Sequence, residues 1–177
     1  RMENSTRAAG PGSYSRITPF NGNWILLEPS SDTIYTLMPD CSLRPFIART
    51  PPIHTMDPEV FLIPRLISNR YYFMEGIKNV YDFRKEEGFP KTYFVYDTQE
   101  KEFSRYIIYN GDYTSKNEFY MVMLTPINAQ GESWATLNAF DLCRDYQKGK
   151  LKGKLKEVAA TLEEDDNRVV MLVKSKK

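Results

Sequence analysis

The residues best suited to chemistry gather around one histidine. His54 is the single histidine of this 177-residue chain, and Asp57 and Glu59 follow it in the Pro-rich stretch PPIHTMDPE. An imidazole with two carboxylates could bind a divalent metal, and a Ser-His-Asp hydrolase would need the same histidine. The stretch has the composition of a solvated connection, and no GxSxG motif occurs in the chain. The sequence therefore predicts no metal site and no catalytic residue.

A run of four acidic residues, from Glu163 to Asp166, is the second candidate. Such a run could bind Ca²⁺ or supply paired carboxylates for acid–base catalysis. We favour the other interpretation, a solvated helix end with its turn, because an amphipathic stretch precedes the run. A glycine-rich phosphate loop is absent from the sequence. We expect no cofactor.

Four residues are candidates for ligand binding rather than for catalysis. Arg65 interrupts the apolar run FLIPRLIS, and an ionised side chain there must face water, a partner carboxylate or a ligand. Trp24 and Trp134 could stack on sugar rings, although large aromatic side chains more often pack in a core. Tyr71 is the fourth candidate, and strand alternation predicts that either Tyr71 or Tyr72 is buried and the other exposed.

Composition excludes several classes of protein. Hydrophobic residues make up 41% of the chain and charged residues 27%, as in folded domains. The formal net charge of +1 gives no electrostatic reason to expect nucleic acid as a partner. No apolar run reaches the ~18 residues of a membrane helix, so we expect no transmembrane segment. Cys41 and Cys143 form no CxxC pair, and we favour two buried free thiols over a long-range disulfide.

Short strand-like runs separated by turn residues fill most of the chain. TIYTLMPDCSLRPFI, which begins at Thr33, can be overlaid on TYFVYDTQEKEFSRYI, which begins at Thr92. Repeats of ~40–50 residues with about four strands each are typical of propeller blades. The predicted strands cover 22–29, 33–39, 43–50, 61–68, 70–76, 92–98, 102–109, 118–127 and 133–142. We predict an all-β chain of about three β-propeller blades, each of four antiparallel strands, in which Arg65 lies on a strand beside the central channel.

The C-terminal part of the chain changes its pattern. One apolar stripe at helical spacing comprises Leu151, Leu155, Val158, Ala159 and Leu162. It predicts one helix over roughly 150–164, and the β-branched run RVVMLVK (168–174) predicts a final strand. The helix is therefore expected to be inserted in the last blade. Residues 1–13 are small and polar and are predicted to be disordered, which leaves 14–177 as the partial propeller domain.

The tail LKGKLKEVAATLEEDDNRVVMLVK is similar to the C-terminal signature of a six-bladed β-propeller family of exported bacterial proteins, many of them lipoproteins of gut anaerobes. The segment SDTIYTLMPDCSLRPFI resembles the recurring blade element of that family. The resemblance covers roughly residues 20–177. It implies a propeller fold and export to the periplasm or cell surface, and it supplies no catalytic residue.

These observations lead to a functional hypothesis with one alternative. The hypothesis is a non-enzymatic binding or scaffold module of the cell envelope that recognises glycan or a surface partner. The alternative is an extracellular polysaccharide hydrolase or lyase whose carboxylate, Tyr or Arg side chains converge only in the folded protein. Three blades cannot close a ring, and they would leave an apolar face in water. We therefore expect self-association or pairing with a complementary propeller chain.

Overall fold

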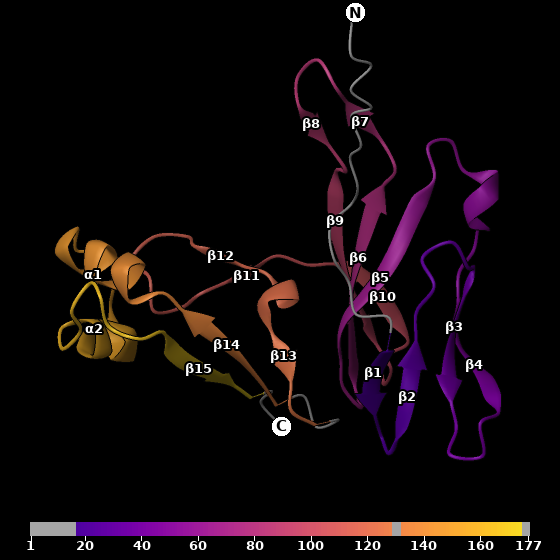
Figure 1. Cartoon of the computed structure of the whole chain (residues 1–177), viewed down its shortest axis with the longest axis horizontal. Coiled ribbons are helices and arrows are strands. Elements are labelled where there is room, and N and C mark those ends of the chain that lie inside the picture. Colours follow the sequence, from indigo (N-terminus) through magenta and orange to yellow (C-terminus); the bar gives the residue numbers. More distant parts are fainter. Residues whose placement is uncertain (1–16, 129–131, 175–177) are drawn as a thin grey trace, which may run out of the picture. The chain divides into compact units, whose positions relative to one another are not determined.

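The chain folds mainly into short β-strands in antiparallel sheets, which confirms the predicted all-β class (Figure 1). This computed structural model describes residues 17–128 and 132–174. Within these ranges there are two α-helices, α1 and α2. The segment 1–13, which was predicted to be disordered, lies outside the described residues.

The described residues belong to two compact units. Those within Arg1–Pro64 and Met74–Phe94 form the first unit, and those within Arg65–Phe73 and Val95–Lys177 form the second. Each unit has its own buried residues.

The first unit contains a four-stranded sheet with the order β1-β2-β3-β4. Its strands are β1 (Ile17–Phe20), β2 (Asn23–Leu26), β3 (Thr33–Leu37) and β4 (Leu43–Ala48). Asn21 and Gly22 connect β1 to β2, and their φ angles of 49° and 72° are those of the two-residue hairpin turn that matches the twist of the strands. The sequence analysis predicted no strand at β1.

A second four-stranded sheet has the order β10-β9-β6-β5. Its strands are β5 (Val60–Ile67), β6 (Tyr71–Lys78), β9 (Lys91–Asp97) and β10 (Glu102–Arg105). Between β6 and β9 lies a small hairpin of β7 (Tyr81–Asp82) and β8 (Glu87–Gly88), where only a charged connection was predicted. Gly88 permits this hairpin, since a Cβ there would lie 2.7 Å from the carbonyl oxygen of Val80.

The first unit also buries a charge. Within β6, Glu75 and Ile77 both have 0% exposure, and Met74 beside them is buried. Lys91 Nζ lies 3.0 Å from Glu75 Oε1, and this ammonium neutralises the oxygen although the contact lacks hydrogen-bond geometry. A buried carboxylate requires such a partner because the low-dielectric interior disfavours an isolated charge.

The second unit ends in a three-stranded sheet with the order β13-β14-β15. Its strands are β13 (Thr125–Pro126), β14 (Ser133–Leu137) and β15 (Val169–Val173). The predicted strand 118–127 is broken into β12 (Glu118–Phe119), a 3₁₀ turn (Met121–Met123) and β13, and β12 pairs with β11 (Ile108–Tyr109). In a 3₁₀ turn the backbone hydrogen bonds join residues three apart within the same segment, so these groups cannot pair with a neighbouring strand. A single strand therefore cannot continue through the turn.

Two helices lie between β14 and β15 in the sequence, α1 (Ala139–Gln147) and α2 (Gly153–Ala159). The predicted helical insertion before the final strand is therefore confirmed, but it has two helices instead of one. The predicted strand 133–142 was too long, because Asn138 ends it and caps α1 by accepting a hydrogen bond from the amide of Phe140 at 2.9 Å.

Two apolar clusters support the second unit. One joins Leu66, Met121, Leu124 and Ala135, with Phe73 and Tyr106 packed against it. The other consists of Leu142, Leu151, Leu155 and Ala159, with Leu137, Leu162 and Val169 packed against it, and so contains every residue of the predicted stripe except Val158. The 3.6-residue period thus identified the buried face of α2 correctly.

Two further predictions concern the burial of the two thiols and membrane-spanning segments. Both cysteines are free thiols, and Cys143 is buried as predicted. The prediction that Cys41 is also buried was wrong: Cys41 is exposed in the turn between β3 and β4, where its φ is 63°. Among the described residues, neither helix has the length and hydropathy needed to cross a membrane.

Candidate functional site

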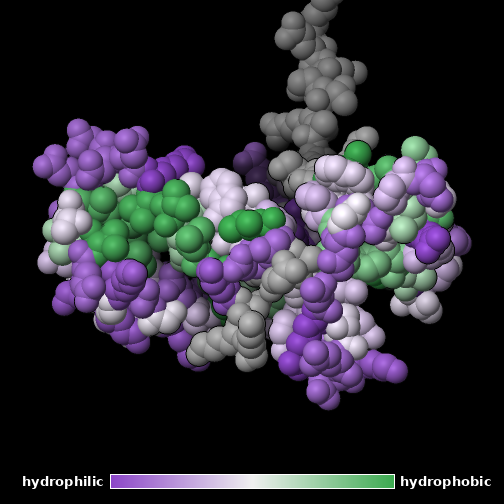
Figure 2. All heavy atoms as spheres, turned by 90° about the horizontal axis from the view of Figure 1, so that it is seen from below, coloured by the Kyte–Doolittle hydropathy of each residue, from purple (hydrophilic) through white to green (hydrophobic). Residues whose placement is uncertain are grey.

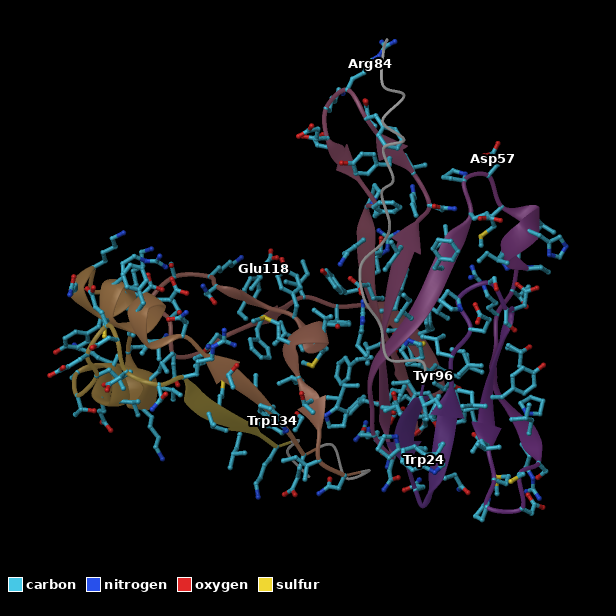
Figure 3. All side chains as sticks on the ribbon, viewed as in Figure 1. Trp24, Asp57, Arg84, Tyr96, Glu118 and Trp134 are labelled. Carbon is cyan, nitrogen blue, oxygen red and sulfur yellow. The ribbon has the colours of Figure 1, made fainter. Side chains whose placement is uncertain are left out.

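A cleft of about 350 Å³ in the second unit gathers polar side chains from segments far apart in the sequence. The turn after β11, the strand β12, the start of α1 and the residue before β15 all contribute to it. Its lining residues are Asn110, Tyr113, Asn117, Glu118, Phe119, Met123, Thr136, Leu137, Asn138, Asp141, Leu142 and Arg168. We call this set the polar cleft. Glu118, one of its carboxylates, projects from β12 in Figure 3.

Two side chains of the polar cleft have their hydrogen-bonding groups available. Within the described residues, neither the Arg168 guanidinium nor the Asn117 amide forms a side-chain hydrogen bond or an ion pair. Arg168 is exposed and Asn117 is half-buried. The guanidinium offers five N–H donors, and the amide offers both donors and an acceptor. These groups can therefore bind a polar ligand without first breaking a contact within the described structure.

The two carboxylates of the cleft are already oriented by neighbours. Asp141 forms an ion pair with Arg144 at 2.9 Å, one turn further along α1. Glu118 accepts a hydrogen bond from the hydroxyl of Tyr120. Both acidic residues are exposed, so they remain available as acceptors for ligand hydroxyl groups.

Tyr113 is held in the cleft wall by a buried charge. Its hydroxyl donates to Asp145 Oδ2 at 3.2 Å, and Asp145 is 8% exposed on α1. Lys150 Nζ and Arg144 Nε lie 3.5 and 3.7 Å from Asp145 Oδ1 and balance the carboxylate. Burial, and then the nearby Asp145, raises the pKa of Tyr113 above its ordinary value. The phenol therefore stays protonated at neutral pH, which excludes it as a general base there.

Backbone hydrogen bonds fix the turn that carries Tyr113. The amide of Thr114 donates to the carbonyl of Lys150 at 2.8 Å, and the amide of Lys152 donates to the carbonyl of Asp112 at 2.7 Å. Tyr113 and Leu151 form an antiparallel bridge between these segments. The segment that leads into α2 thus anchors one wall of the polar cleft.

The chemistry of the cleft suits a polyhydroxylated molecule. Amide, carboxylate and guanidinium groups alternate with the apolar side chains of Phe119, Met123 and Leu142. Small-molecule sites combine apolar walls with a few polar groups that fix orientation. A sugar presents hydroxyl groups at its edge and C–H groups on its face, so it can use both kinds of wall.

The four predicted ligand-binding residues lie elsewhere. Trp24 on β2 is 48% exposed and Trp134 on β14 is 38% exposed, so neither ring is in a core (Figure 3). Arg65 on β5 is partly buried, and Tyr71 on β6 packs near Phe73 with ring centroids 6.1 Å apart. None of the four lines the polar cleft, and Trp24 belongs to the other unit.

The predicted alternation at Tyr71 and Tyr72 was wrong. Both residues are partly buried. The guanidinium of Arg70 covers the ring of Tyr71 at 4.9 Å, and Tyr72 packs near Tyr96 with ring centroids 6.0 Å apart. The two tyrosine rings lie on opposite faces of the strand, and neighbouring side chains partly cover each of them.

The other acidic and histidine candidates do not converge. His54 Nδ1 lies 3.9 Å from Asp32 Oδ2, and Glu59 accepts a hydrogen bond from the amide of Asn79 at 3.1 Å. In the acidic run, Asp166 Oδ2 accepts from the Glu163 amide at 2.8 Å and thereby closes a turn. In the part of the chain that is described, no three His, Cys, Asp or Glu side chains come together as metal ligands.

The sequence analysis missed the polar cleft because its residues come from three distant stretches. The single local signal is the stretch YNGDYTSKNE (109–118), which joins two predicted strands and is rich in hydroxyl and amide side chains. Arg168 lies in the turn before the final strand. Its position in the sequence does not indicate which distant residues it lies beside in the folded chain.

Comparison with models of known protein families finds no match, and comparison with curated proteins finds none. One solved structure with a similar fold is a Bacteroides fragilis NCTC 9343 protein described as a "putative exported protein". The TM-score is 0.58 at 14% sequence identity, and the match covers 91% of this chain and 49% of that one. This likeness shows the fold alone. The present chain spans about half the length of the similar structure.

Proposed function

We propose that the protein is a non-enzymatic binding module of the cell envelope that recognises glycan in the polar cleft. The observation that carries the proposal is the pairing of available donors on Arg168 and Asn117 with exposed carboxylate acceptors on Glu118 and Asp141 in one cleft. Such a set can hydrogen-bond several hydroxyl groups at once, while Phe119 offers an apolar surface to the sugar face.

The proposal includes a propeller architecture and an exported location. Successive antiparallel sheets of three or four strands support an interpretation as blades, with the two-helix insertion in the last of them. The match to about half of a protein described as exported supports a six-bladed arrangement in which this chain supplies about three blades. Attachment to the envelope, as in the lipoproteins of the resembling family, belongs to the same proposal.

The experiment is a glycan-array screen of the purified chain, followed by titration of any hit. We expect Arg168→Ala and Asn117→Ala to weaken binding at least about tenfold, since each removes a hydrogen-bonding partner worth roughly 1–3 kcal/mol. Arg105→Ala is the matched control, because Arg105 is an exposed arginine on β10 that does not line the cleft. Binding that is unaffected by both cleft variants would refute the location.

The exposed ring of Trp24 remains a proposed glycan contact of the first unit, and Arg65, Tyr71 and Trp134 remain separate proposed contacts of the second unit. Trp24→Ala is therefore included in the same titration. Loss of binding in this variant, with full binding in Arg168→Ala, would place the ligand on the first unit instead of in the polar cleft.

One observation favours the alternative, a polysaccharide hydrolase or lyase. Two carboxylates, Glu118 and Asp141, line the same cleft, as acid and base do in glycosidases. Against it, the general acid of such enzymes sits in a partly desolvated setting, whereas both of these side chains are exposed. Incubation of a bound glycan with the protein decides: shortened products that disappear in Glu118→Gln would establish the enzyme.

A further inference from the structure

The exposed ring of Trp134 lies beside the polar cleft, on one face of β14. Side chains alternate between the two faces of a strand, so Trp134 points to the same face as Thr136. The alternating residues Ser133 and Ala135 are 0% and 3% exposed, whereas Trp134 is 38% exposed. Thr136 lines the polar cleft. One face of β14 therefore leads from the cleft to an exposed indole ring.

The two neighbouring strands widen this face. Trp134 lies opposite Thr125 of β13 and opposite Leu172 of β15, which is 65% exposed. Thr125 is exposed as well, and Met123, two residues before it, lines the polar cleft. Figure 2 shows hydrophobic side chains gathered where β15 lies, with hydrophilic side chains on both sides of them. We call Trp134, Thr125 and Leu172 the aromatic platform.

Polar groups border the aromatic platform at the end of β14 opposite to the cleft. Glu132 directly precedes β14, and its Oε1 lies 2.8 Å from Nζ of Lys174, which directly follows β15. Asn128 donates to the other oxygen of Glu132 at 2.7 Å. A carboxylate and an ammonium group each have room for more than one hydrogen bond, so both can also bind ligand hydroxyl groups. An aromatic ring between hydrogen-bonding groups suits a sugar, which has C–H groups on its face and hydroxyl groups at its edge.

The spacing of the cleft and the platform sets the length of the ligand. Arg168 directly precedes β15, and Leu172, four residues later, marks the level of Trp134. Four residues of a strand extend about 13 Å, at about 3.3 Å per residue. This distance exceeds the width of a single sugar ring. A monosaccharide therefore cannot contact both ends of the surface, whereas a chain of sugar units can.

The charges along this surface balance one another. In the polar cleft, the guanidinium of Arg168 is offset by the carboxylate of Glu118, and Asp141 is paired with Arg144 at 2.9 Å. At the platform, the single carboxylate is paired with the single ammonium group. Because no charge of either sign is in excess, the surface favours an uncharged ligand over a polyanion.

We propose that the polar cleft and the aromatic platform together bind a neutral, linear glycan, with one sugar unit in the cleft and a later unit stacked on Trp134. The inference rests on the proposed glycan binding and adds to it the class of glycan and the number of units that are bound. It also gives Trp134 a role distinct from that of the cleft residues, because the ring contacts only ligands that are longer than one unit.

The test is calorimetric titration of the full chain with linear oligosaccharides of glucose, xylose, mannose and N-acetylglucosamine, each from one to six units long. For at least one series we expect Kd to fall about tenfold between one and three units and then to level off, because a large ring adds buried area and stacking. Trp134→Ala should remove this gain and leave the affinity for the monosaccharide unchanged. Arg168→Ala should weaken binding at every length. Phe103→Ala is the matched control, since Phe103 is a 53% exposed aromatic residue on β10 outside this surface, and it should keep the gain.

The outcomes separate this inference from the proposed function. If no oligosaccharide binds, both are wrong. If binding depends on Arg168 but has the same Kd at every length, or if Trp134→Ala keeps the gain, the cleft site stands and the extended surface is refuted. A galacturonic acid series that binds more tightly than every neutral series would overturn the neutral class. Circular dichroism establishes that each variant folds, and Trp134→Gln replaces Trp134→Ala if the latter does not; the length dependence of the wild type needs no substitution.

Discussion

The ion pair of Glu75 and Lys91 offers the sharpest test of the first unit. Lys91→Met keeps the length of the side chain and removes its charge, which takes one ammonium group away from a carboxylate with 0% exposure; the other contacts of Glu75 remain. At the observed 3.0 Å, Coulomb's law with an effective dielectric of about 20 gives an attraction of about 5.5 kcal/mol. Lys91 is 39% exposed, so solvent screens part of that attraction. Because Glu75 keeps its other contacts, we expect the variant to lose about 1–2 kcal/mol of unfolding free energy.

Urea unfolding at pH 7, followed by circular dichroism, measures this loss. Lys78→Met is the control, because Lys78 is an exposed lysine on β6 with no ion pair within the described residues. The double variant Glu75→Gln with Lys91→Met should recover part of the loss, because the buried charge is then gone. A Lys91→Met protein within about 0.5 kcal/mol of the wild type would refute the reasoning, as would a double variant less stable than the single one.

Two further predictions concern a pH dependence and a tight hairpin. The hydrogen bonds from Arg70 to Asp97, at 2.8–3.2 Å, lower the pKa of that carboxyl, so the pair stabilises the fold above about pH 4 and its contribution is lost as pH falls through the lowered pKa. Asp97→Asn should therefore lower the urea midpoint at pH 7, and the difference from the wild type should vanish near pH 2; an equal difference at both pH values would contradict the linkage. Gly88→Ala places a methyl group against main-chain atoms of Val80 and Tyr81 and should cost about 1–3 kcal/mol, with faster hydrogen exchange in the β7–β8 hairpin. Gly111→Ala, which meets nothing within 4 Å, should leave exchange there unchanged.

Much of the strand pattern could be predicted because its signals are local. The runs at β3, β4, β5, β6 and β9 all fall within predicted strands or extend them by one or two residues. The strand β1 could also have been found, since Phe20-Asn21-Gly22-Asn23 carries the dipeptide most typical of a two-residue hairpin. The pattern SWATLNAFDL gave a predicted strand that was too long, because its apolar alternation continues past Asn138. In the structure the strand stops before Asn138, and the side chain of Asn138 caps α1.

The polar cleft could not be predicted by the same means. Tyr113 is placed by hydrogen bonds between residues 112–114 and 150–152, and its orientation depends on Asp145 of α1, a helix that the sequence analysis interpreted partly as strand. Arg168 reaches the cleft because β15 returns to pair with β14, and Leu137 pairs with Val169 across 31 intervening residues. Contacts of this kind follow from tertiary packing, which a single sequence does not display.

The unequal environments of the two thiols make this chain selectively reactive. Cys41 lies exposed on a surface turn, whereas Cys143 is buried on α1 and its Sγ donates to the carbonyl of Leu162 at 3.4 Å. Burial raises the pKa of the Cys143 thiol, and because the thiolate is the nucleophile, a maleimide should modify Cys41 first. The second, slower modification then requires that α1 separate from the segment after α2. The rate of that step therefore measures how often the helical insertion opens while the rest of the protein stays folded.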